Sequence, residues 1–231
     1  TLLHGVIDSP DIPLNVSRSY LQSDGNVKKI SAHITKKVSD KLEEMFKNDR
    51  KDFESKWEDL QVFVQYGMLS EDKFSEKAKT FALLKSADAN YYTVEEYKEK
   101  IAPLQTDKDG KVIVLYSNNP SEQFGFVKKA KERGYDVVTM DSPLAPHWIA
   151  KMEHEFENVV FSRVDADTLD KLIKKEEEIP SKLSKEEEEV LKPFFEKILD
   201  TQKFTVQFES MSASEAPIII TQPEFIRRMM E

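Results

Sequence analysis

The sequence has no cysteine, and this absence excludes disulfide bonds, thiolate metal ligands and a cysteine nucleophile. It has no apolar run near the roughly 20 residues that cross a bilayer, and its first residues lack the basic-then-apolar layout of a signal peptide. Its six glycines are scattered singly, so the sequence contains no P-loop and no G-x-G-x-x-G segment. We therefore expect a protein of a reducing compartment, the cytoplasm, that does not act in a membrane.

Basic residues are outnumbered, since 43 acidic and 34 basic side chains give the 231 residues a net charge of −9. Such a chain repels the phosphates of nucleic acid on average, so nucleic acid is not an expected partner. The hydrophobic content of 39% is enough for the core of one large or two modest domains. The chain starts without methionine and ends within a helical pattern, and we interpret it as an excised part of a longer protein.

The first half of the sequence has the apolar periodicity of helices. Apolar side chains recur every three or four positions in one long stretch, which predicts an amphipathic helix: Val27, Ile30, Ile34, Val38, Leu42 and Met45. The same spacing continues with almost no glycine as far as Leu83, and Trp57 is expected in the core of this part. These segments predict a helical layer.

From about Tyr91 onward, strands and helices alternate. Thr93 and Glu96 form a capping box that opens a short helix. Apolar and β-branched runs predict strands at 112–116, 137–140 and 159–161, and helices are expected at 119–133 and 145–156. This alternation predicts a small sheet of mostly parallel strands covered by helices, so the expected fold class is α/β, of the mixed α+β kind.

A stretch rich in glutamate and lysine, residues 174–189, is typical of a solvated linker, and we expect a domain boundary near Pro180. Beyond it, Ser184 and Glu187 form a second capping box, which predicts a helix. Alternating apolar residues predict strands at 204–208 and 217–221, followed by a helix from about Pro223. These elements would be the start of a second α+β module.

The predicted βαβ region raises the hypothesis of a Rossmann-type nucleotide site. The turn after its first strand, Ser117-Asn118-Asn119-Pro120, contains no glycine, so we expect a structural scaffold there and no independent nucleotide binding. No metal site is expected either. His147 and His154 lie two helical turns apart, roughly 10 Å along the axis, which is too far for one ion.

Arg18 lies among polar side chains where a proline-stiffened turn leads into a helix start. A guanidinium is planar and permanently charged, so it can pair with two phosphate oxygens and neutralise the charge that develops on a γ-phosphate. An arginine near a helix start is more often a surface charge. The residues alone leave both interpretations open.

The segment from Gly5 to Arg18, GVIDSPDIPLNVSR, resembles the catalytic-loop signature in the middle domain of the heat-shock protein 90 family. Later segments are similar in the same order: GYDV at 134–137, APIII at 216–220 and RRMM at 227–230. The resemblance covers nearly the whole chain, although the linker matches only in composition. It assigns residues 1–175 to the later part of a chaperone middle domain, and residues 176–231 to the charged linker and the start of a C-terminal domain.

The resemblance implies an ATP-dependent chaperone of the bacterial type, active in the stress response, that works as a homodimeric clamp on unfolded or partly folded client proteins. ATP and Mg²⁺ would bind to a separate N-terminal domain of the same protein. Closure would bring Arg18 to the γ-phosphate, with Asn15 and Gln22 in support, whereas Ser19 and Tyr20 depart from several family members. The full-length protein would hydrolyse ATP, and this chain alone would neither bind nor hydrolyse it.

In bacterial members of the family, an exposed tryptophan at this point of the middle domain is associated with client binding. Trp148 is therefore a candidate client contact, and its neighbours His147, Ile149, Lys151 and Met152 complete the candidate patch. A lone tryptophan is more often a core residue, so both interpretations stay open. A different class of function also stays open, namely a non-enzymatic acidic module whose α/β part displays interaction surfaces.

Overall fold

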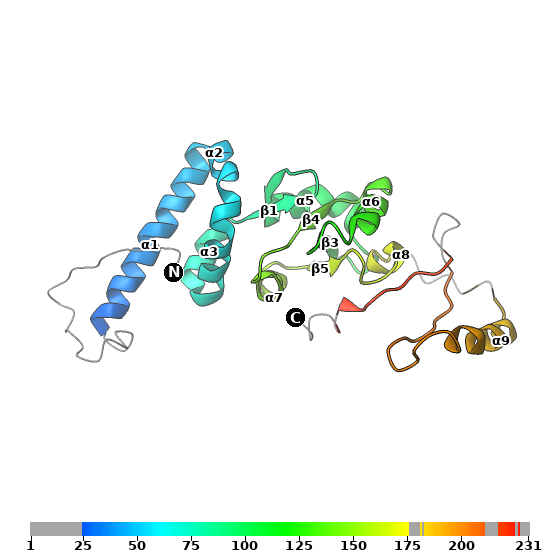
Figure 1. The fold of residues 1–231 in the computed structure, drawn as a ribbon. Helices are drawn as coiled ribbons and strands as arrows, with labels where there is room; N and C mark the ends of the chain where they lie inside the picture. The colour runs from blue at the N-terminus through cyan, green and yellow to red at the C-terminus, as the bar shows by residue number, and fades with distance from the viewer. Residues whose placement is uncertain (1–24, 176–180, 182, 211–216, 225, 227–231) are drawn as a thin grey trace.

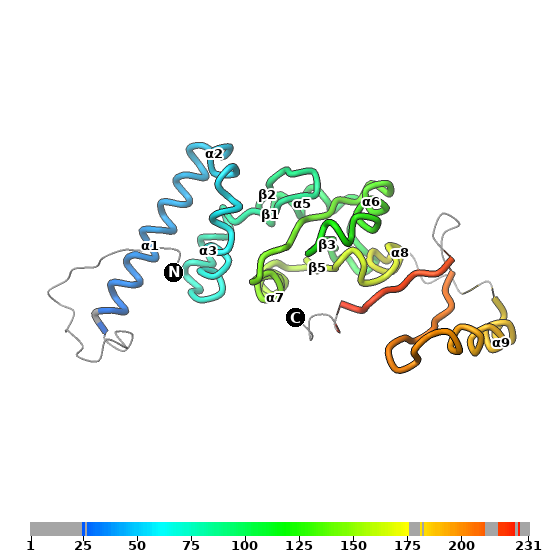
Figure 2. Tube along the Cα trace, viewed as in Figure 1, coloured from blue at the N-terminus to red at the C-terminus, as the bar shows by residue number. Residues whose placement is uncertain are grey.

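The computed structural model describes residues 25–175, 181, 183–210, 217–224 and 226. Figures 1 and 2 show three parts in chain order: a group of helices, a sheet with its covering helices, and a C-terminal part that contains one more helix. The first two parts share one hydrophobic core. The mixed α/β class expected from the sequence is confirmed.

The first part is a helical layer, and its four helices are α1 (Gly25–Asn48), α2 (Arg50–Ser55), α3 (Trp57–Ser70) and α4 (Asp72–Ala78). The long helix expected at 27–45 is confirmed as α1. Asp49 caps α2, because its side chain accepts a hydrogen bond from the backbone N–H of Asp52 at 3.0 Å. The buried faces of α2 to α4 supply large core side chains, namely Phe53, Trp57, Met68 and Phe74.

A five-stranded sheet forms the centre of the second part, with β1 (Leu83–Ser86), β2 (Tyr91–Thr93), β3 (Val112–Ser117), β4 (Val137–Thr139) and β5 (Val159–Arg163). Its strand order is β2-β1-β4-β3-β5. Strand β3 pairs in parallel with β4 and β5, whereas β1 is antiparallel to both of its neighbours. The sheet is therefore mixed, with the expected parallel strands in one half.

Helices cover the sheet on both faces, and with it they form the α/β unit: α5 (Val94–Gln105), α6 (Phe124–Glu132), α7 (Ala145–Glu155) and α8 (Leu169–Leu172). Alternate residues of β3 point to opposite faces, as the period of a strand requires. Val112, Val114 and Tyr116 join the core that is shared with the helical layer, α5 and α7. Ile113 and Leu115 join a second core with residues of α6 and α8.

Two local expectations for this part are wrong. The helical pattern extends to Leu83, but Leu83 begins β1, because this segment finds backbone partners on both sides in β2 and β4. The helix expected from Asn119 begins only at Phe124. Asn119 caps a preceding turn instead, and its side chain accepts from the backbone N–H of Glu122 at 3.3 Å.

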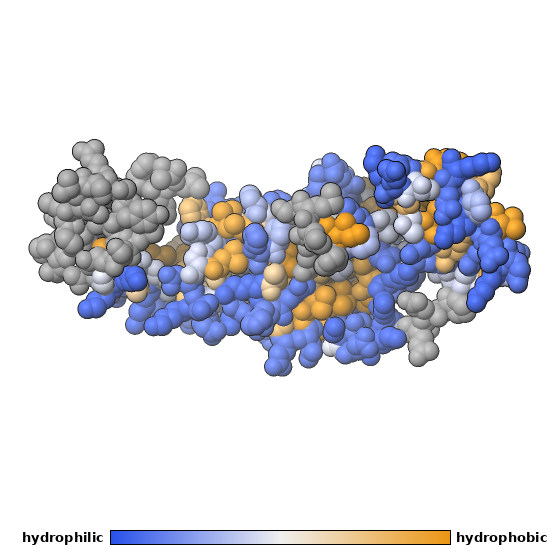
Figure 3. Space-filling model, turned by 90° about the horizontal axis from the view of Figure 1, so that it is seen from below, coloured by the Kyte–Doolittle hydropathy of each residue, from blue (hydrophilic) through white to orange (hydrophobic). Residues whose placement is uncertain are grey.

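The C-terminal part contains α9 (Lys185–Glu196), which begins at the predicted capping box of Ser184 and Glu187. None of its residues is buried, and Val190 and Phe194 are 76% and 63% exposed. Apolar surface is visible in Figure 3 at the end of the molecule that carries α9. The strands expected at 204–208 and 217–221 are not formed, since these segments lack a backbone ladder with a neighbouring strand.

Gly67 of α3 lets α4 approach closely, because a Cβ atom there would lie 2.7 Å from the ring of the buried Phe74. We expect Gly67→Ala to lower the free energy of unfolding by about 1 to 2 kcal/mol, since overpacking outweighs the gain in helix propensity. Gly125→Ala on α6 is the matched control, because no atom lies within 4 Å of its added Cβ. It should be neutral or stabilising by up to about 1 kcal/mol. Urea unfolding of both variants tests the difference, and equal effects would contradict the packing argument.

Candidate functional site

The candidate catalytic residues Asn15, Arg18 and Gln22 lie outside the described residues, as do Ser19 and Tyr20. In the sequence, Arg18 precedes Gly25, the first residue of α1, by seven positions. Seven residues of chain span at most about 25 Å. The length of the connecting chain therefore keeps the backbone of Arg18 within about 25 Å of Gly25.

Trp148 is a core residue. It lies on α7 with an exposed fraction of 1%, and its Nε1–H points to the sulfur of Met68 on α3 at 3.3 Å. Its ring also packs edge-on against Phe161 of β5, with 6.4 Å between the centroids. The indole thus joins the helical layer to the α/β unit.

The other members of the expected client patch are divided between core and surface. Ile149 and Met152 are buried with Trp148, whereas His147 is exposed. Lys151 pairs with Glu155 of the same helix at 3.2 Å and with Asp72 at 3.4 Å. Of the two interpretations left open for Trp148, the structure shows the buried one, because residues 145, 148, 149 and 152 form the buried stripe of an amphipathic helix.

The turn after β3 is the place where an α/β sheet commonly holds a phosphate. Here the side-chain carbonyl of Gln123, which is 4% exposed, accepts from the backbone N–H groups of Asn118 and Asn119 at 3.1 and 3.2 Å. It also accepts from the hydroxyl of Ser117 at 2.7 Å. The Gln123 carbonyl therefore occupies the backbone N–H groups that could otherwise bind a phosphate, and these residues do not fit a bound nucleotide.

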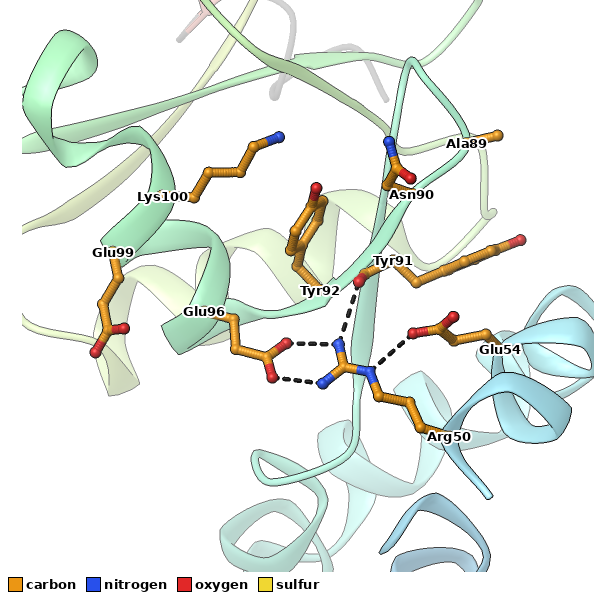
Figure 4. Close-up of a pocket in the computed structure, with 9 residues that line it drawn as sticks. All are labelled: Arg50, Glu54, Ala89, Asn90, Tyr91, Tyr92, Glu96, Glu99 and Lys100. Carbon is orange, nitrogen blue, oxygen red and sulfur yellow. Dashed lines mark hydrogen bonds and ion pairs between the residues drawn. The ribbon is translucent and has the colours of Figure 1, made fainter. Parts of the chain in front are cut away.

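A shallow hollow of about 720 Å³ lies between α2, the β1–β2 turn and α5 (Figure 4). Arg50 is at its base, and its Nε donates to Glu54 at 2.8 Å. Its Nη1 and Nη2 donate to the two carboxylate oxygens of Glu96 at 2.5 and 2.7 Å, and Nη2 also reaches the carbonyl of Tyr91 at 3.2 Å. One guanidinium therefore connects α2, β2 and α5.

The Glu96 carboxylate also accepts a hydrogen bond from the backbone N–H of Thr93 at 2.8 Å, which completes the capping box of α5. The hydrogen bonds from Arg50, and then that from the backbone of Thr93, hold the pKa of Glu96 below its ordinary value, against the effect of burial. In turn, the hydrogen bonds to Glu96 raise the pKa of Arg50. Two carboxylates therefore neutralise the guanidinium, which makes this hollow a poor site for a phosphate.

The capping box was predictable from the sequence, but its partner Arg50 was not, since the two positions lie 46 residues apart. Lys100 completes the charged lining. Its ammonium lies 4.5 Å from the ring centroid of Tyr92 and pairs with Asp136. In the described part of the chain, no group of three or more histidine, aspartate or glutamate residues is arranged to hold a metal ion. Within the same residues, no helix is both long and apolar enough to span a membrane.

The described residues thus form a scaffold of the mixed α/β class with no nucleotide cradle of its own. Comparison with known families gives the family, because the profile described as "Hsp90 protein" matches residues 1–229. The chain belongs to the heat-shock protein 90 family. The resemblance inferred from the catalytic-loop sequence is confirmed.

Its bacterial relatives are chaperone proteins named HtpG. The chain is 53% identical to the HtpG of Porphyromonas gingivalis and 52% identical to that of Bacteroides thetaiotaomicron, each over 100% of this chain and 34% of the relative. The chain therefore spans about a third of the length of these relatives. Among solved structures, the middle domain of a heat shock protein from Plasmodium falciparum has a TM-score of 0.47 and 13% identity, over 62% of this chain and 58% of that one.

The buried position of Trp148 predicts a large loss of stability on truncation. Trp148→Ala should lower the free energy of unfolding by about 3 to 5 kcal/mol, because it leaves a cavity between α7 and α3. His147→Ala on the exposed face of the same helix is the control and should change it by less than about 0.5 kcal/mol. Thermal or urea unfolding measures both, and a Trp148→Ala variant of unchanged stability would contradict the core assignment.

Gln123 is expected to matter for folding. Gln123→Leu removes one acceptor that serves three donors, and we expect the free energy of unfolding to fall by about 1 to 3 kcal/mol. Glu122→Ala changes an exposed neighbour on the same turn and is the control. Equal stability of the two variants in urea unfolding would show that water replaces the side-chain carbonyl without loss.

Proposed function

We propose that this chain is the later part of the middle domain of an ATP-driven chaperone, residues 1–175, joined to a charged linker and the start of the C-terminal domain, residues 176–231. Four observations support this proposal. The family profile extends over residues 1–229, and the chain matches 34% of its bacterial relatives. The shared cores end with Ile173 near α8, and α9 contributes no buried residue.

In this proposal Arg18 is a catalytic residue of a split active site. ATP with its Mg²⁺ is held by a separate N-terminal domain of the same protein, and domain closure brings the guanidinium to the γ-phosphate, with Asn15 and Gln22 in support. The observation that carries the proposal is the loop sequence GVIDSPDIPLNVSR in a chain that belongs to the family. The self-filled turn at Gln123 also supports a nucleotide site outside the described residues.

The whole protein would act as a cytoplasmic homodimeric clamp that binds unfolded or partly folded proteins under stress. Closure of the clamp would couple hydrolysis to a shift between conformations. Nucleic acid is not a partner in this scheme, in keeping with the net charge of −9, and a membrane has no role. Trp148 is left out of the client surface because it belongs to the core.

A second candidate is a non-enzymatic acidic interaction module. The exposed apolar side chains on the acidic helix α9 favour it, since such a helix face suits a protein partner. The two candidates differ in whether the full-length protein binds and hydrolyses ATP.

Arg18→Ala in the full-length protein should lower the rate of ATP turnover at least about tenfold, because arginine fingers contribute roughly 10³ to 10⁵ in phosphoryl transfer. The dissociation constant for ATP should change much less, since another domain holds the nucleotide. Lys29→Ala removes an exposed cation from α1 and is the matched control, with turnover unchanged. Normal turnover in Arg18→Ala would remove the catalytic assignment.

Isothermal titration of ATP separates the candidates further. The 231-residue chain, shown to be folded by a cooperative thermal transition, should not bind ATP, whereas the full-length protein should. Binding by the chain itself would favour a self-contained enzyme. Absence of binding by both would favour the interaction module.

A further inference from the structure

Strand β5 lies at one end of the order β2-β1-β4-β3-β5 and is therefore an edge strand of the sheet that the structure describes. The backbone N–H of Val164, just after β5, donates to the carbonyl of Tyr116 on β3. Because N–H groups alternate in direction along a strand, those of Phe161 and Arg163 point to the outer side of the sheet. An outward N–H group of an edge strand is one that a further strand can pair with.

Two carboxylates cover these outward N–H groups. The N–H of Phe161 donates to Glu153 of α7 at 2.8 Å, and that of Arg163 donates to Glu224 at 3.1 Å. Each carboxylate takes the place that a carbonyl of a neighbouring strand would have. Glu153 belongs to the α/β unit, whereas Glu224 belongs to the C-terminal part of the chain, so part of the edge is closed by a segment from outside the unit.

Glu224 also bonds to a side chain of the sheet. Its other carboxylate oxygen accepts from the hydroxyl of Tyr116 at 2.6 Å, and Tyr116 is a buried member of the shared core. Residues 217–224, drawn in red, run back toward the sheet in Figure 1. Pro223 and Glu224 line a smaller hollow of about 330 Å³ together with Val160 of β5. One carboxylate therefore holds the segment 217–224 at the end of β5.

The C-terminal part shares no core with the α/β unit in the described residues. None of the described side chains from position 181 onward is buried. A second polar contact between the two is the ion pair of Lys171 on α8 with Glu209. Parts of a chain that are joined by a small, polar interface move relative to each other unless particular contacts hold them. Polar contacts such as those of Glu224 therefore keep the C-terminal part in place.

We propose that Glu224, with its donors Tyr116 and Arg163, is the latch of a conformational switch. With the latch closed, the C-terminal part is docked on the α/β unit and the end of β5 is covered. With the latch open, the C-terminal part changes its position relative to the α/β unit, and the Arg163 N–H becomes accessible to solvent. The latch is independent of the proposed catalytic role of Arg18.

The geometry of the latch favours two distinct states over gradual sliding. Tyr116 and Arg163 are paired across β3 and β5, so the two donors are fixed relative to each other by the sheet. Each oxygen of the Glu224 carboxylate serves one of them. Hydrogen bonds weaken steeply with misalignment. A shift of the segment 217–224 therefore breaks both contacts together, and small differences in free energy then decide which state is populated.

Two substitutions open the latch in different ways. Glu224→Ala removes the carboxylate, whereas Tyr116→Phe removes one donor and keeps the ring in the core. Two controls separate the latch from other effects. Glu189→Ala removes an exposed carboxylate of the same C-terminal part, on α9, and Gly67→Ala weakens the fold at the contact of α3 with α4.

The position of the C-terminal part is measured in the full-length protein by spin labels at two exposed positions, Lys128→Cys on α6 and Lys192→Cys on α9. The 231 residues contain no cysteine of their own. Any cysteine outside them is replaced, and labelled protein is diluted with excess unlabelled protein. We expect Glu224→Ala and Tyr116→Phe to broaden or shift the distance distribution, and both controls to leave it unchanged.

Hydrogen–deuterium exchange of the segment 159–164, measured without labels, reports on the edge of β5. Glu224→Ala should raise the exchange rate of the Arg163 amide at least about tenfold, because a hydrogen bond to a charged acceptor is lost. Faster exchange with an unchanged distance would show that Glu224 only caps the strand, and would overturn the switch, as would no change in either measurement. An equal change of distance in Gly67→Ala would also overturn it, since the distance would then follow a general loss of stability.

Discussion

Arg50 and Glu96 are 46 positions apart in the sequence, and they meet in a bidentate pair where the helical layer reaches the sheet. Glu96 is shared between this pair and the first turn of α5, so the start of that helix and its polar contact with α2 depend on one carboxylate. A continuous core lies behind them, with Met68 of α3 against Trp148 of α7. The core resists separation of the helical layer from the α/β unit, and the Arg50–Glu96 pair fixes their relative orientation.

The α/β unit has parallel strands, as many ligand-binding sheets do, but the turn after β3 is not suited to bind an anion. Parallel strands ending at one edge often leave backbone N–H groups free for an anion. Here the buried carbonyl of Gln123 takes two of those N–H groups and the Ser117 hydroxyl. A side chain that satisfies the turn from within stabilises the unit and removes its capacity for phosphate. The described unit is therefore suited to a structural role and not to phosphate binding at this turn.

The regular elements were predictable where the local pattern is strong, as in α1, β3 and the capping boxes at Thr93 and Ser184. The β1–β2 hairpin was not, because its strands are short and its turn places Ala89, a non-glycine residue, at a φ of 59°. Strands expected at 204–208 and 217–221 depended on partners that no local pattern specifies. The general preference of a lone tryptophan for the core favoured a buried Trp148, and the family association favoured an exposed one.

The proposed catalytic loop was predictable only as a sequence, because in the proposed scheme its chemistry needs a nucleotide from another domain, whereas the Arg50–Glu96 contact joins segments far apart in the sequence. Burial of apolar area is non-directional, so a helix held by packing alone can rock without losing much contact. A planar fork on a carboxylate loses its geometry with a small rotation. The orientation of α2 against the α/β unit therefore depends on the Arg50–Glu96 pair, while the apolar core beside it supplies the buried area.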